Sequence, residues 1–442
     1  MPRFSPNALA EILNQDIAGH YRLAYSGGLD STVLLHAMVE LQASLPLSFS
    51  ALHVHHGLNP EADAWASHCR HECERHNVTY QQFNVDATPV KGQSPEETAR
   101  ELRYEALASV MQAGDVLLTA HHQDDQAETL LLQLMRGCGV PGLAAMPFET
   151  DFTCGKLQRP LLGFSRAELE SYANERQLCW VEDGSNLDKS YDRNFMRHDI
   201  LPALVERWPA AIANLQRTAS HMSEAGTLLD ELAIEDLAHC GLDNASSLEI
   251  GRLKQLPKPR VRNALRYWLR ARGLNVPSQS QLQQVISDVL YSSPDAVACV
   301  HWQGVDVRKY QGRLYALSSM SSHDSHQTVN WDMSKPVQIN GVGRLDVRQT
   351  RGEGLSASLM GQCYDIRFRQ GGERVQPVNR GHHHELKKLF QEAGVPPWER
   401  DRTPILYKGD EILAIAGLCI CEPYQAGKDQ PGLILEWNPD FS

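Results

Sequence analysis

Over its first two hundred residues the chain alternates short apolar runs with amphipathic stretches of helical periodicity. Five apolar runs predict buried strands, at Tyr21–Tyr25, Ser50–Val54, Tyr80–Val85, Val116–Ala120 and Cys179–Val181. Five amphipathic stretches predict helices, at Ser31–Gln42, Glu61–Asn77, Ser94–Gln112, Asp125–Arg136 and Ser165–Gln177. Strands that alternate with helices form right-handed crossovers and a parallel sheet. We therefore predict an α/β fold, a doubly wound parallel sheet, in which ligands bind beyond the carboxyl ends of the strands.

The pattern changes after Pro202. Residues 210–239 predict one or two long helices, a basic helix follows at 260–272, and residues 297–317 predict short strands. The polar, serine-rich residues 318–328 are typical of a linker. From about Trp331 on, alternating strands surround one basic helix at 385–393. We expect three domains: the α/β domain over residues 1–215, a mostly helical basic domain over 216–320, and a small α+β domain over 330–442.

The composition excludes several classes of protein. Of the 442 residues, 42% are hydrophobic and 22% are charged, which is the balance of an ordinary soluble protein. Ten scattered cysteines indicate a reducing cytoplasm rather than a disulfide framework. Residues 1–20 lack the features of a secretory signal, and the longest apolar stretch, residues 412–421, is about half of the ~20 residues that cross a bilayer. We expect a cytoplasmic protein with no membrane partner.

The charge is unevenly distributed along the chain. The net charge is −12, which by itself argues against a nucleic-acid partner. Residues 61–128 carry most of the excess acid, whereas residues 252–272 hold eight bases and no acid. Because salt screens surface charges beyond about 8 Å, the local patch matters more to a polyanion than the sum. We interpret residues 252–272 as a surface for nucleic acid or phosphate; a solvated helix face would usually include interspersed acids.

The glycine pair between the first predicted strand and helix is the sharpest sign of chemistry. The sequence there is Ser26-Gly27-Gly28-Leu29-Asp30-Ser31. Adjacent glycines let the backbone turn tightly and approach a ligand, and the amides of the following helix then face an anion. No lysine follows, so the loop differs from the Walker type, which occurs nowhere in the chain. A plain turn would need neither the paired glycines nor the flanking serines.

This loop resembles the pyrophosphate-binding loop of the N-type ATP pyrophosphatase (PP-loop) superfamily, which adenylates a carbonyl oxygen and releases pyrophosphate. Within that superfamily the chain resembles the tRNA(Ile)-lysidine synthetase family over nearly its whole length. The motifs that carry the resemblance are His53–Leu58, Ala120–Thr129, Arg136–Gly139, Asp183–Asn194 and Lys387–Arg400. The last is the most specific, because other members of the superfamily lack the domain to which it belongs.

The resemblance implies a ligase that uses ATP and Mg²⁺. The wobble cytidine of a tRNA(Ile) with a CAU anticodon would be adenylated, and the ε-amine of free L-lysine would then expel AMP to give lysidine. The modification would change codon reading from AUG to AUA and the charged amino acid from methionine to isoleucine. The first domain would bind ATP and catalyse, and the other two would bind the tRNA. The sequence leaves open whether the chain forms a homodimer and how methionine tRNA is rejected.

Residues 121–129 form a second polar cluster, at the point where a predicted strand meets a helix. Two adjacent carboxylates, Asp124 and Asp125, lie at a predicted helix N-terminus, where one acid would be enough to compensate the helix dipole. The pair therefore favours the binding of a divalent cation or an amine. We expect Asp30 and Asp125 to hold Mg²⁺ and to act in catalysis together with His122. The alternative is an acidic helix cap beside two solvent-facing histidines. The sequence does not decide which acid binds Mg²⁺, which acts as base, or which histidine acts.

Three histidines lie at the end of the second predicted strand. His53, His55 and His56 lack the thiol or spaced partner of a zinc site. The resemblance implies that one of them lines the nucleotide pocket, and we expect this to be His55. The nucleotide-binding residues expected in all are Ser26, Gly27, Gly28, Leu29, Asp30, Ser31 and His55.

Several basic and polar side chains are candidates for substrate contacts. Arg136 lies in the Arg-Gly-x-Gly motif, whose glycine pattern lacks the strand that a dinucleotide fingerprint requires. Arg193, Asn194 and Arg197 form a tight group that either clamps a phosphate or caps the first domain. The expected substrate-binding residues are Arg136, Arg193, Asn194, Arg197, Arg266, Arg270, Lys387, Lys388 and Arg400.

Three other classes of protein remain as alternatives. A sulfur-inserting tRNA thiolase would use a Cys-x-x-Cys pair, which the chain lacks. An amidotransferase would need a glutaminase domain, for which the sequence shows no sign. A non-enzymatic tRNA-binding module would not need both a phosphate loop and an acid cluster.

Overall fold

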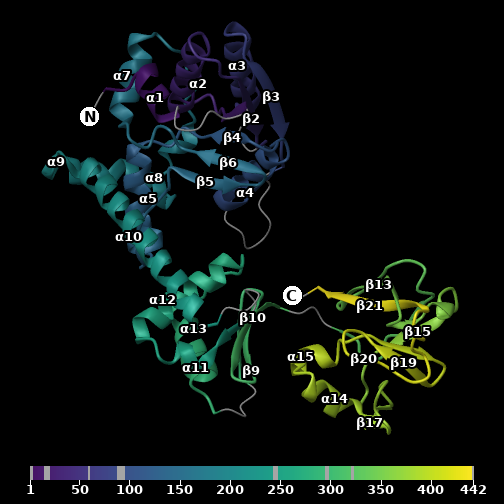
Figure 1. The fold of residues 1–442 in the computed structure, drawn as a ribbon. Helices are drawn as coiled ribbons and strands as arrows, with labels where there is room; N and C mark the ends of the chain where they lie inside the picture. Colours follow the sequence, from purple (N-terminus) through teal and green to yellow (C-terminus); the bar gives the residue numbers. More distant parts are fainter. Residues whose placement is uncertain are drawn as a thin grey trace. The chain divides into compact units, whose positions relative to one another are not determined.

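The computed structural model describes residues 3–13, 20–57, 60–86, 95–241, 247–293, 298–319 and 323–440. The chain divides into two compact units, Met1–Leu228 and Leu229–Ser442 (Figure 1). The division into three domains that the sequence predicts stays a prediction. No helix among the described residues is long and apolar enough to span a membrane.

A six-stranded sheet forms the centre of the first unit. Its strand order is β3-β2-β1-β4-β6-β5. The strands are β1 (His20–Ala24), β2 (Phe49–His55), β3 (Thr79–Asn84), β4 (Asp115–Leu118), β5 (Glu149–Phe152) and β6 (Gly155–Gln158). The first four strands are parallel, as predicted, and β6, which was not predicted, is parallel to β4. Only the edge strand β5 is antiparallel. The carboxyl ends of β1, β4 and β6 therefore lie side by side at one edge of the sheet.

Helices surround this sheet. They are α1 (Pro6–Leu13), α2 (Leu29–Gln42), α3 (Ala62–Arg75), α4 (Pro95–Ala108), α5 (Gln123–Met135), α6 (Val140–Leu143), α7 (Arg166–Glu175), α8 (Asp192–Phe195) and α9 (Leu201–Arg207). All five helices predicted for this region are present within a few residues of their expected ends. The expected start of α4 at Ser94 lies outside the described residues.

Both faces of the sheet are buried, because side chains that alternate along a strand enter two separate apolar clusters. Leu23 of β1 and Leu118 of β4 pack with Leu34 of α2 in the larger cluster. Leu117, one residue earlier in β4, packs on the other face with Leu107 of α4. This two-sided burial explains why inner strands such as β2 and β4 are mostly apolar in the sequence.

The predicted strand at Cys179–Val181 is wrong. Residues 179–181 form no strand, although the Val181 amide donates one backbone hydrogen bond to the Gly27 carbonyl, at 2.9 Å. The place beside β4 is taken instead by β6, which the sequence reading missed together with β5. These two strands carry polar side chains such as Glu149 and Lys156, which pair with each other and hide the apolar pattern of a strand.

The second unit begins within α10 (Ala211–His239), a single helix where one or two had been expected. It continues with α11 (Ile250–Leu253), α12 (Lys258–Ala271), α13 (Gln279–Gln284) and the sheet β7-β10-β9-β8. The strands of this sheet are β7 (Ser247–Glu249), β8 (Cys299–Trp302), β9 (Val305–Tyr310) and β10 (Arg313–Ser318). The buried face of α12, including Val261, Leu265 and Trp268, packs into the same apolar cluster as these strands, which leaves its arginines on the outside.

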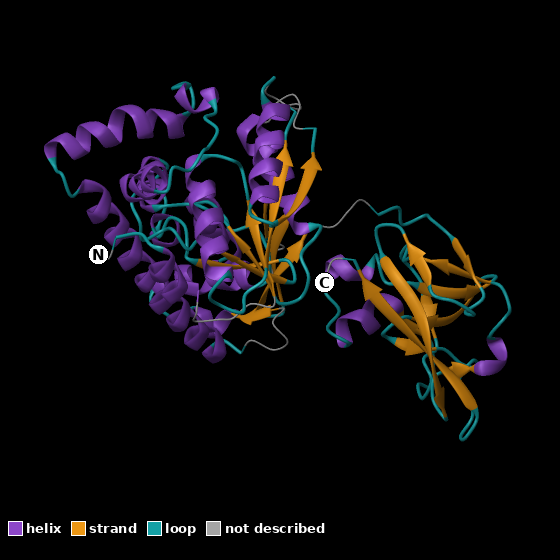
Figure 2. Ribbon diagram, turned by 90° about the horizontal axis from the view of Figure 1, so that it is seen from above, coloured by secondary structure: helices purple, strands orange, loops and turns teal. Residues whose placement is uncertain are grey.

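The C-terminal part of the second unit consists mainly of strands, drawn in orange in Figure 2. One sheet has the order β11-β15-β18-β19-β20, a second β12-β13-β21-β14, and a third consists of β16 and β17. The strands are β11 (Val329–Trp331), β12 (Val337–Ile339), β13 (Gly343–Arg351), β14 (Leu355–Ser356), β15 (Tyr364–Arg367), β16 (Arg374–Val375), β17 (His384–Glu385), β18 (Ile405–Lys408), β19 (Glu411–Ile415), β20 (Cys419–Ile420) and β21 (Pro431–Pro439). The predicted basic helix is α14 (Leu386–Glu392), followed by α15 (Pro397–Arg400). The expected α+β character is confirmed.

Candidate active site and nucleic-acid surface

The loop between β1 and α2 lies at the carboxyl edge of the first sheet. Gly27 has a φ of 83°, and Gly28 precedes α2 without offering the helix a capping side chain. Hydroxyl groups fix the shape of the loop: the Oγ atoms of Ser26 and Ser31 lie 3.0 Å apart, and Thr32 Oγ1 donates to the Gly27 carbonyl at 3.3 Å. The first amides of α2 therefore lack a side-chain acceptor, and helix starts of this kind bind anions.

Gly27 has no room for a side chain. A Cβ atom there would lie 2.7 Å from Cys69 Sγ on α3 and 3.1 Å from a methyl group of Val181. A Cβ atom on Gly28 would have Ser26 Oγ as its nearest neighbour, at 3.6 Å, which is an ordinary contact. The first glycine of the pair is thus required by its conformation and by its neighbours, whereas the second is not.

Three carboxylates surround the ring of His122, which lies at the start of α5 and is buried. Its Nε2 is 3.6 Å from Oδ2 of Asp30 and 3.4 Å from Oδ2 of Asp125, and its Nδ1 is 3.7 Å from Oδ2 of Asp124. Burial lowers the pKa of His122, but these carboxylates outweigh it and raise the pKa above its ordinary value. The structure thus brings together Asp30, His122 and Asp125, which the sequence predicts as catalytic.

Two arginines bridge the acids of α5. Arg193 contacts Asp125 Oδ1 with Nη2 at 2.9 Å and Glu128 Oε2 with Nε at 2.8 Å. Arg197 contacts the same Asp125 oxygen at 3.0 Å and Glu128 Oε1 at 2.6 Å. Glu128 is only 1% exposed. Of the two interpretations left open by the sequence, this geometry resembles the capping network, because both guanidinium groups are already engaged by carboxylates.

The network also fixes the charge of Asp125. Burial alone would raise its pKa, but His122 and Arg193 outweigh burial and hold the pKa below its ordinary value. One oxygen of Asp125 accepts from both arginines, and the other accepts from the His122 amide at 3.0 Å. Both oxygens of this carboxylate are therefore occupied within the protein.

The residues fit a divalent cation at Asp30 better than at Asp125. Asp30 Oδ1 is buried and has no hydrogen-bond partner among the described residues. Within the same residues no group of three or more histidine, cysteine or acidic side chains could hold a metal ion by itself. Mg²⁺ commonly binds to one or two carboxylates and completes its shell with water and substrate phosphates. The geometry therefore favours Asp30 as the protein ligand.

The histidines at the end of β2 differ in their contacts. His53 is buried and its Nδ1 lies 2.9 Å from the Tyr25 carbonyl, so it serves packing. His55, the expected nucleotide contact, has Nε2 3.1 Å from Oδ1 of Asp63. Burial lowers the pKa of His56 to about 4, which keeps the ring neutral at physiological pH.

The remaining predicted substrate contacts of the first unit lie outside this cluster. Arg136 is exposed at the end of α5. Asn194 donates its side-chain amide to the carbonyls of Ser185 and Asp188, at 3.0 and 2.9 Å, and so shapes its own loop. Sequence reasoning missed Glu128, although it lies three residues after Asp125 and therefore on the same helix face.

The arginines of α12 fall into two groups. Arg260 pairs with Asp236 and Arg270 with Asp230, both acids of α10. The acids missing from residues 252–272 are thus supplied by a neighbouring helix, and one of them already pairs with Arg270, which the sequence predicts as a substrate contact. Arg262 and Arg266 have no carboxylate partner among the described residues.

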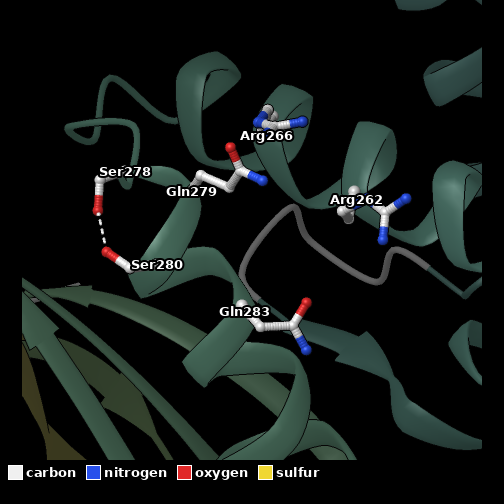
Figure 3. A pocket seen from close by; sticks show the side chains of 6 residues that line it. All are labelled: Arg262, Arg266, Ser278, Gln279, Ser280 and Gln283. Atoms are coloured by element: carbon white, nitrogen blue, oxygen red, sulfur yellow. Dashed lines mark hydrogen bonds between the residues drawn. The ribbon is translucent and has the colours of Figure 1, made fainter. Parts of the chain in front are cut away.

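Arg262 and Arg266 line an open hollow of about 940 Å³ (Figure 3). Its other wall consists of polar side chains at and after the start of α13, namely Ser278, Gln279, Ser280 and Gln283. Two unpaired guanidinium groups that face serine and glutamine donors form a surface suited to phosphate groups.

The predicted contacts near the C-terminus differ in exposure. Lys387 and Lys388 are exposed on α14, whose opposite face is buried. Arg400 is only 8% exposed. Its Nε donates to the Val395 carbonyl at 2.8 Å and its Nη2 to the Tyr310 hydroxyl at 2.7 Å. This burial argues against the prediction that Arg400 contacts a substrate.

Comparison with known proteins places the whole chain in one family. Residues 4–204 match the PP-loop domain, residues 248–315 the TilS substrate binding domain, and residues 364–437 the TilS substrate C-terminal domain. The tRNA(Ile)-lysidine synthase of Coxiella burnetii is 40% identical over 438 residues, which cover 99% of this chain and 97% of that protein. The chain belongs to the tRNA(Ile)-lysidine synthase family.

Another tRNA(Ile)-lysidine synthase, from Methylococcus capsulatus, is 41% identical over 95% of this chain and 96% of its own length. Among solved structures, the U34-tRNA thiolase NcsA from Methanococcus maripaludis aligns with a TM-score of 0.44 and 17% identity, over 50% of this chain and 77% of that one. That value is too low to support an argument. The predictions of the family, of the fold class and of a ligase that uses ATP are confirmed.

The glycine pair of this tRNA(Ile)-lysidine synthase family member allows a matched test. In Gly27→Ala the methyl group would meet Cys69 and the φ would be strained, so we expect a loss of about 1–2 kcal/mol of stability together with weakened ATP binding. Gly28→Ala is the control, with a loss below about 1 kcal/mol, because Gly28 precedes the helix, where alanine is less favourable than glycine. Urea unfolding and ATP titration measure both effects. Equal losses in the two variants would contradict the assigned geometry.

The ion-pair network of Glu128 allows a second test. In Glu128→Gln both guanidinium groups lose a buried counter-charge, which costs about 3 kcal/mol or more. Glu40→Gln, which breaks the exposed pair with Arg176, is the control and should cost less than about 1 kcal/mol. Chemical denaturation measures the free energy of unfolding of both variants. A Glu128→Gln protein as stable as the control would show that the network contributes little to stability.

Proposed function

We propose that this chain joins lysine to the wobble cytidine of tRNA(Ile) and forms lysidine in two steps. ATP first adenylates the ring carbonyl oxygen of the cytidine and releases pyrophosphate. The ε-amine of free lysine then attacks the same carbon and expels AMP. The observation that carries this proposal is the full-length similarity to tRNA(Ile)-lysidine synthases, supported by a phosphate-suited loop and an acid cluster at one sheet edge.

The loop and the acid cluster divide the work of the first step. The amides at the start of α2, with Ser26 and Ser31, bind the phosphates of ATP. When bound, Mg²⁺ neutralises phosphate charge during the displacement, and Asp30 is the residue that would hold it. Attachment of AMP turns the carbonyl oxygen into a good leaving group. The loop therefore acts in the adenylation of the cytidine and not in the formation of the carbon–nitrogen bond.

The acid cluster serves the second step. Lysine arrives as an ammonium ion and must lose a proton before it can attack. The carboxylates of Asp30 and Asp124 lie beside His122 and are less engaged by arginine than Asp125. They attract the ammonium group, and Asp124, which is not the expected Mg²⁺ ligand, can accept its proton.

The tRNA reaches this site through its anticodon loop. Single-stranded loops are the places where proteins read RNA bases, and bringing the wobble base into a pocket costs a few kcal/mol of lost stacking. Binding energy from other parts of the tRNA must offset that cost. The hollow at Arg262 and Arg266 and the exposed lysines of α14 are the described surfaces that suit its backbone.

The place of action and the assembly are expectations of the same proposal. All ten cysteines are free, which suits the reducing cytoplasm, where tRNA is modified. The sequence leaves open whether the chain forms a homodimer.

The decisive experiment follows labelled lysine into tRNA transcripts. Incubation of the enzyme with ATP, labelled lysine and a tRNA(Ile) transcript with a CAU anticodon should label the transcript. A transcript with uridine at the wobble position, or omission of ATP, should abolish labelling. ATP cleavage to AMP and pyrophosphate without labelling would retain the adenylation step and refute lysine as the nucleophile.

The arginines of α12 allow a test of the tRNA surface. Neutralising Arg262 and Arg266 to glutamine should weaken tRNA binding and lower the slope of log K against log salt by about 0.7–0.9 for each phosphate that the variant no longer neutralises. Arg270→Gln should have a smaller effect, because Asp230 already neutralises that guanidinium. Filter binding at several salt concentrations measures the slopes. Unchanged slopes in the double variant would refute the surface.

A further inference from the structure

A buried arginine without a carboxylate partner lies at the same sheet edge as the acid cluster. Arg159 directly follows β6 and is only 8% exposed. Its Nη1 donates to the Pro147 carbonyl at 2.8 Å. Its Nε is buried and has no hydrogen-bond partner among the described residues. A guanidinium in this position is an incompletely satisfied positive charge.

Such an arrangement is energetically unusual. Arginine is almost never buried unless it is paired, because an unpaired buried charge loses its hydration without compensation. No ion pair of Arg159 with an acid occurs among the described side chains. The other described guanidinium groups near the acid cluster, those of Arg193 and Arg197, do have carboxylate partners. Arg159 therefore has the capacity to bind an anion that the protein itself does not supply.

The surroundings of Arg159 are positive rather than acidic. The Tyr104 hydroxyl on α4 hydrogen-bonds to Arg159, and the Arg100 guanidinium lies over the Tyr104 ring, 5.0 Å from its centre. Burial lowers the pKa of His121 to about 4, and Arg193, Arg159 and Arg100 act in the same direction. His121 is thus neutral. Burial lowers the pKa of Arg159, but an arginine side chain stays protonated in a protein, so its guanidinium keeps its positive charge.

This group lies next to the site of the second step. β6 pairs with β4, and the Thr119 amide donates to the Gln158 carbonyl at 3.0 Å, one residue before Arg159. Thr119 is followed along the chain by His121, His122 and Asp125. A positive group and an acid cluster thus follow two adjacent strands, which lie about 4.8 Å apart in a sheet.

Free lysine has the complementary charge pattern. Its ε-ammonium and its α-carboxylate are separated by a flexible four-carbon stem. The ammonium group is drawn to the acids beside His122, and the carboxylate needs a cation a few ångströms away. We propose that Arg159, with Tyr104 and Arg100, binds the α-carboxylate of the lysine substrate and so selects lysine over other amines. This inference rests on the proposed function, because it assumes lysine as the nucleophile.

The test compares lysine with cadaverine, which is lysine without its carboxylate. The wild-type enzyme should use lysine with a kcat/KM roughly 100-fold or more above that of cadaverine, since a site with a buried charged donor rejects a ligand that leaves it unpaired. In Arg159→Met, the value for lysine should fall by about that factor while the value for cadaverine changes little. The discrimination ratio then approaches one. Adenylation, followed as pyrophosphate release, should stay near the wild-type rate.

Two further variants distinguish a loss of carboxylate recognition from a loss of folding. Tyr104→Phe removes only a hydroxyl group and should lower the ratio partially, even if Arg159→Met is unstable. Arg176→Gln removes an exposed guanidinium at the end of α7 that pairs with Glu40, and it should leave the ratio unchanged. Thermal unfolding of each variant separates a loss of folding from a loss of selectivity.

Three results would overturn the inference. An unchanged lysine-to-cadaverine ratio in both Arg159→Met and Tyr104→Phe would show that the carboxylate is not recognised there. A lower salt slope of tRNA binding in Arg159→Met, with the ratio unchanged, would show that the anion is an RNA phosphate. Failure of the wild-type enzyme to attach any lysine would refute the proposed function itself, which is a separate outcome.

Discussion

The paired contacts of Asp125 and Glu128 with Arg193 and Arg197 are the constraint on which the site depends. They tie the segment around α8 to α5, and they orient Asp125 so that its second oxygen accepts from the His122 amide. That bond in turn fixes the start of α5, where the ring of His122 meets Asp30 from the glycine loop. A buried network of this kind is costly to break, because each charge that loses its partner stays buried.

The sheet topology explains why phosphate-binding and acidic groups meet. Parallel strands place all their carboxyl ends at one edge, so β1 contributes the glycine loop, β4 the acid cluster and β6 the buried Arg159. Each group follows a different strand, and each binds a different part of the substrates we propose. Along this edge the acids lie between two groups suited to anions, the glycine loop and Arg159. This order of charges matches the phosphates of ATP at the loop, the amine of lysine at the acids and the carboxylate of lysine at Arg159.

Much of this arrangement was predictable from the sequence, and the exceptions have physical reasons. Short apolar runs bounded by turns identified β1, β2 and β4, which lie inside the sheet and are largely buried. The edge strand β3 was also predicted, although it is more polar and more exposed. The prediction of a strand at residues 179–181 was wrong because apolar residues can also pack beside a loop, as Val181 does at Gly27. The hairpin of β5 and β6 was missed because its side chains are polar. Residue type alone could not show that Arg270 and Arg400 are occupied by Asp230 and Tyr310, since those partners come from distant parts of the chain.

In the proposed reaction, the carbonyl oxygen of the wobble cytidine leaves with AMP. A tRNA(Ile) transcript that carries ¹⁸O only at that oxygen tests it most directly, by mass spectrometry of the AMP released in the presence of lysine. The released AMP should carry one ¹⁸O atom, because lysine attacks the carbon and breaks its bond to the adenylated oxygen. AMP that contains no ¹⁸O while lysine is attached would contradict it.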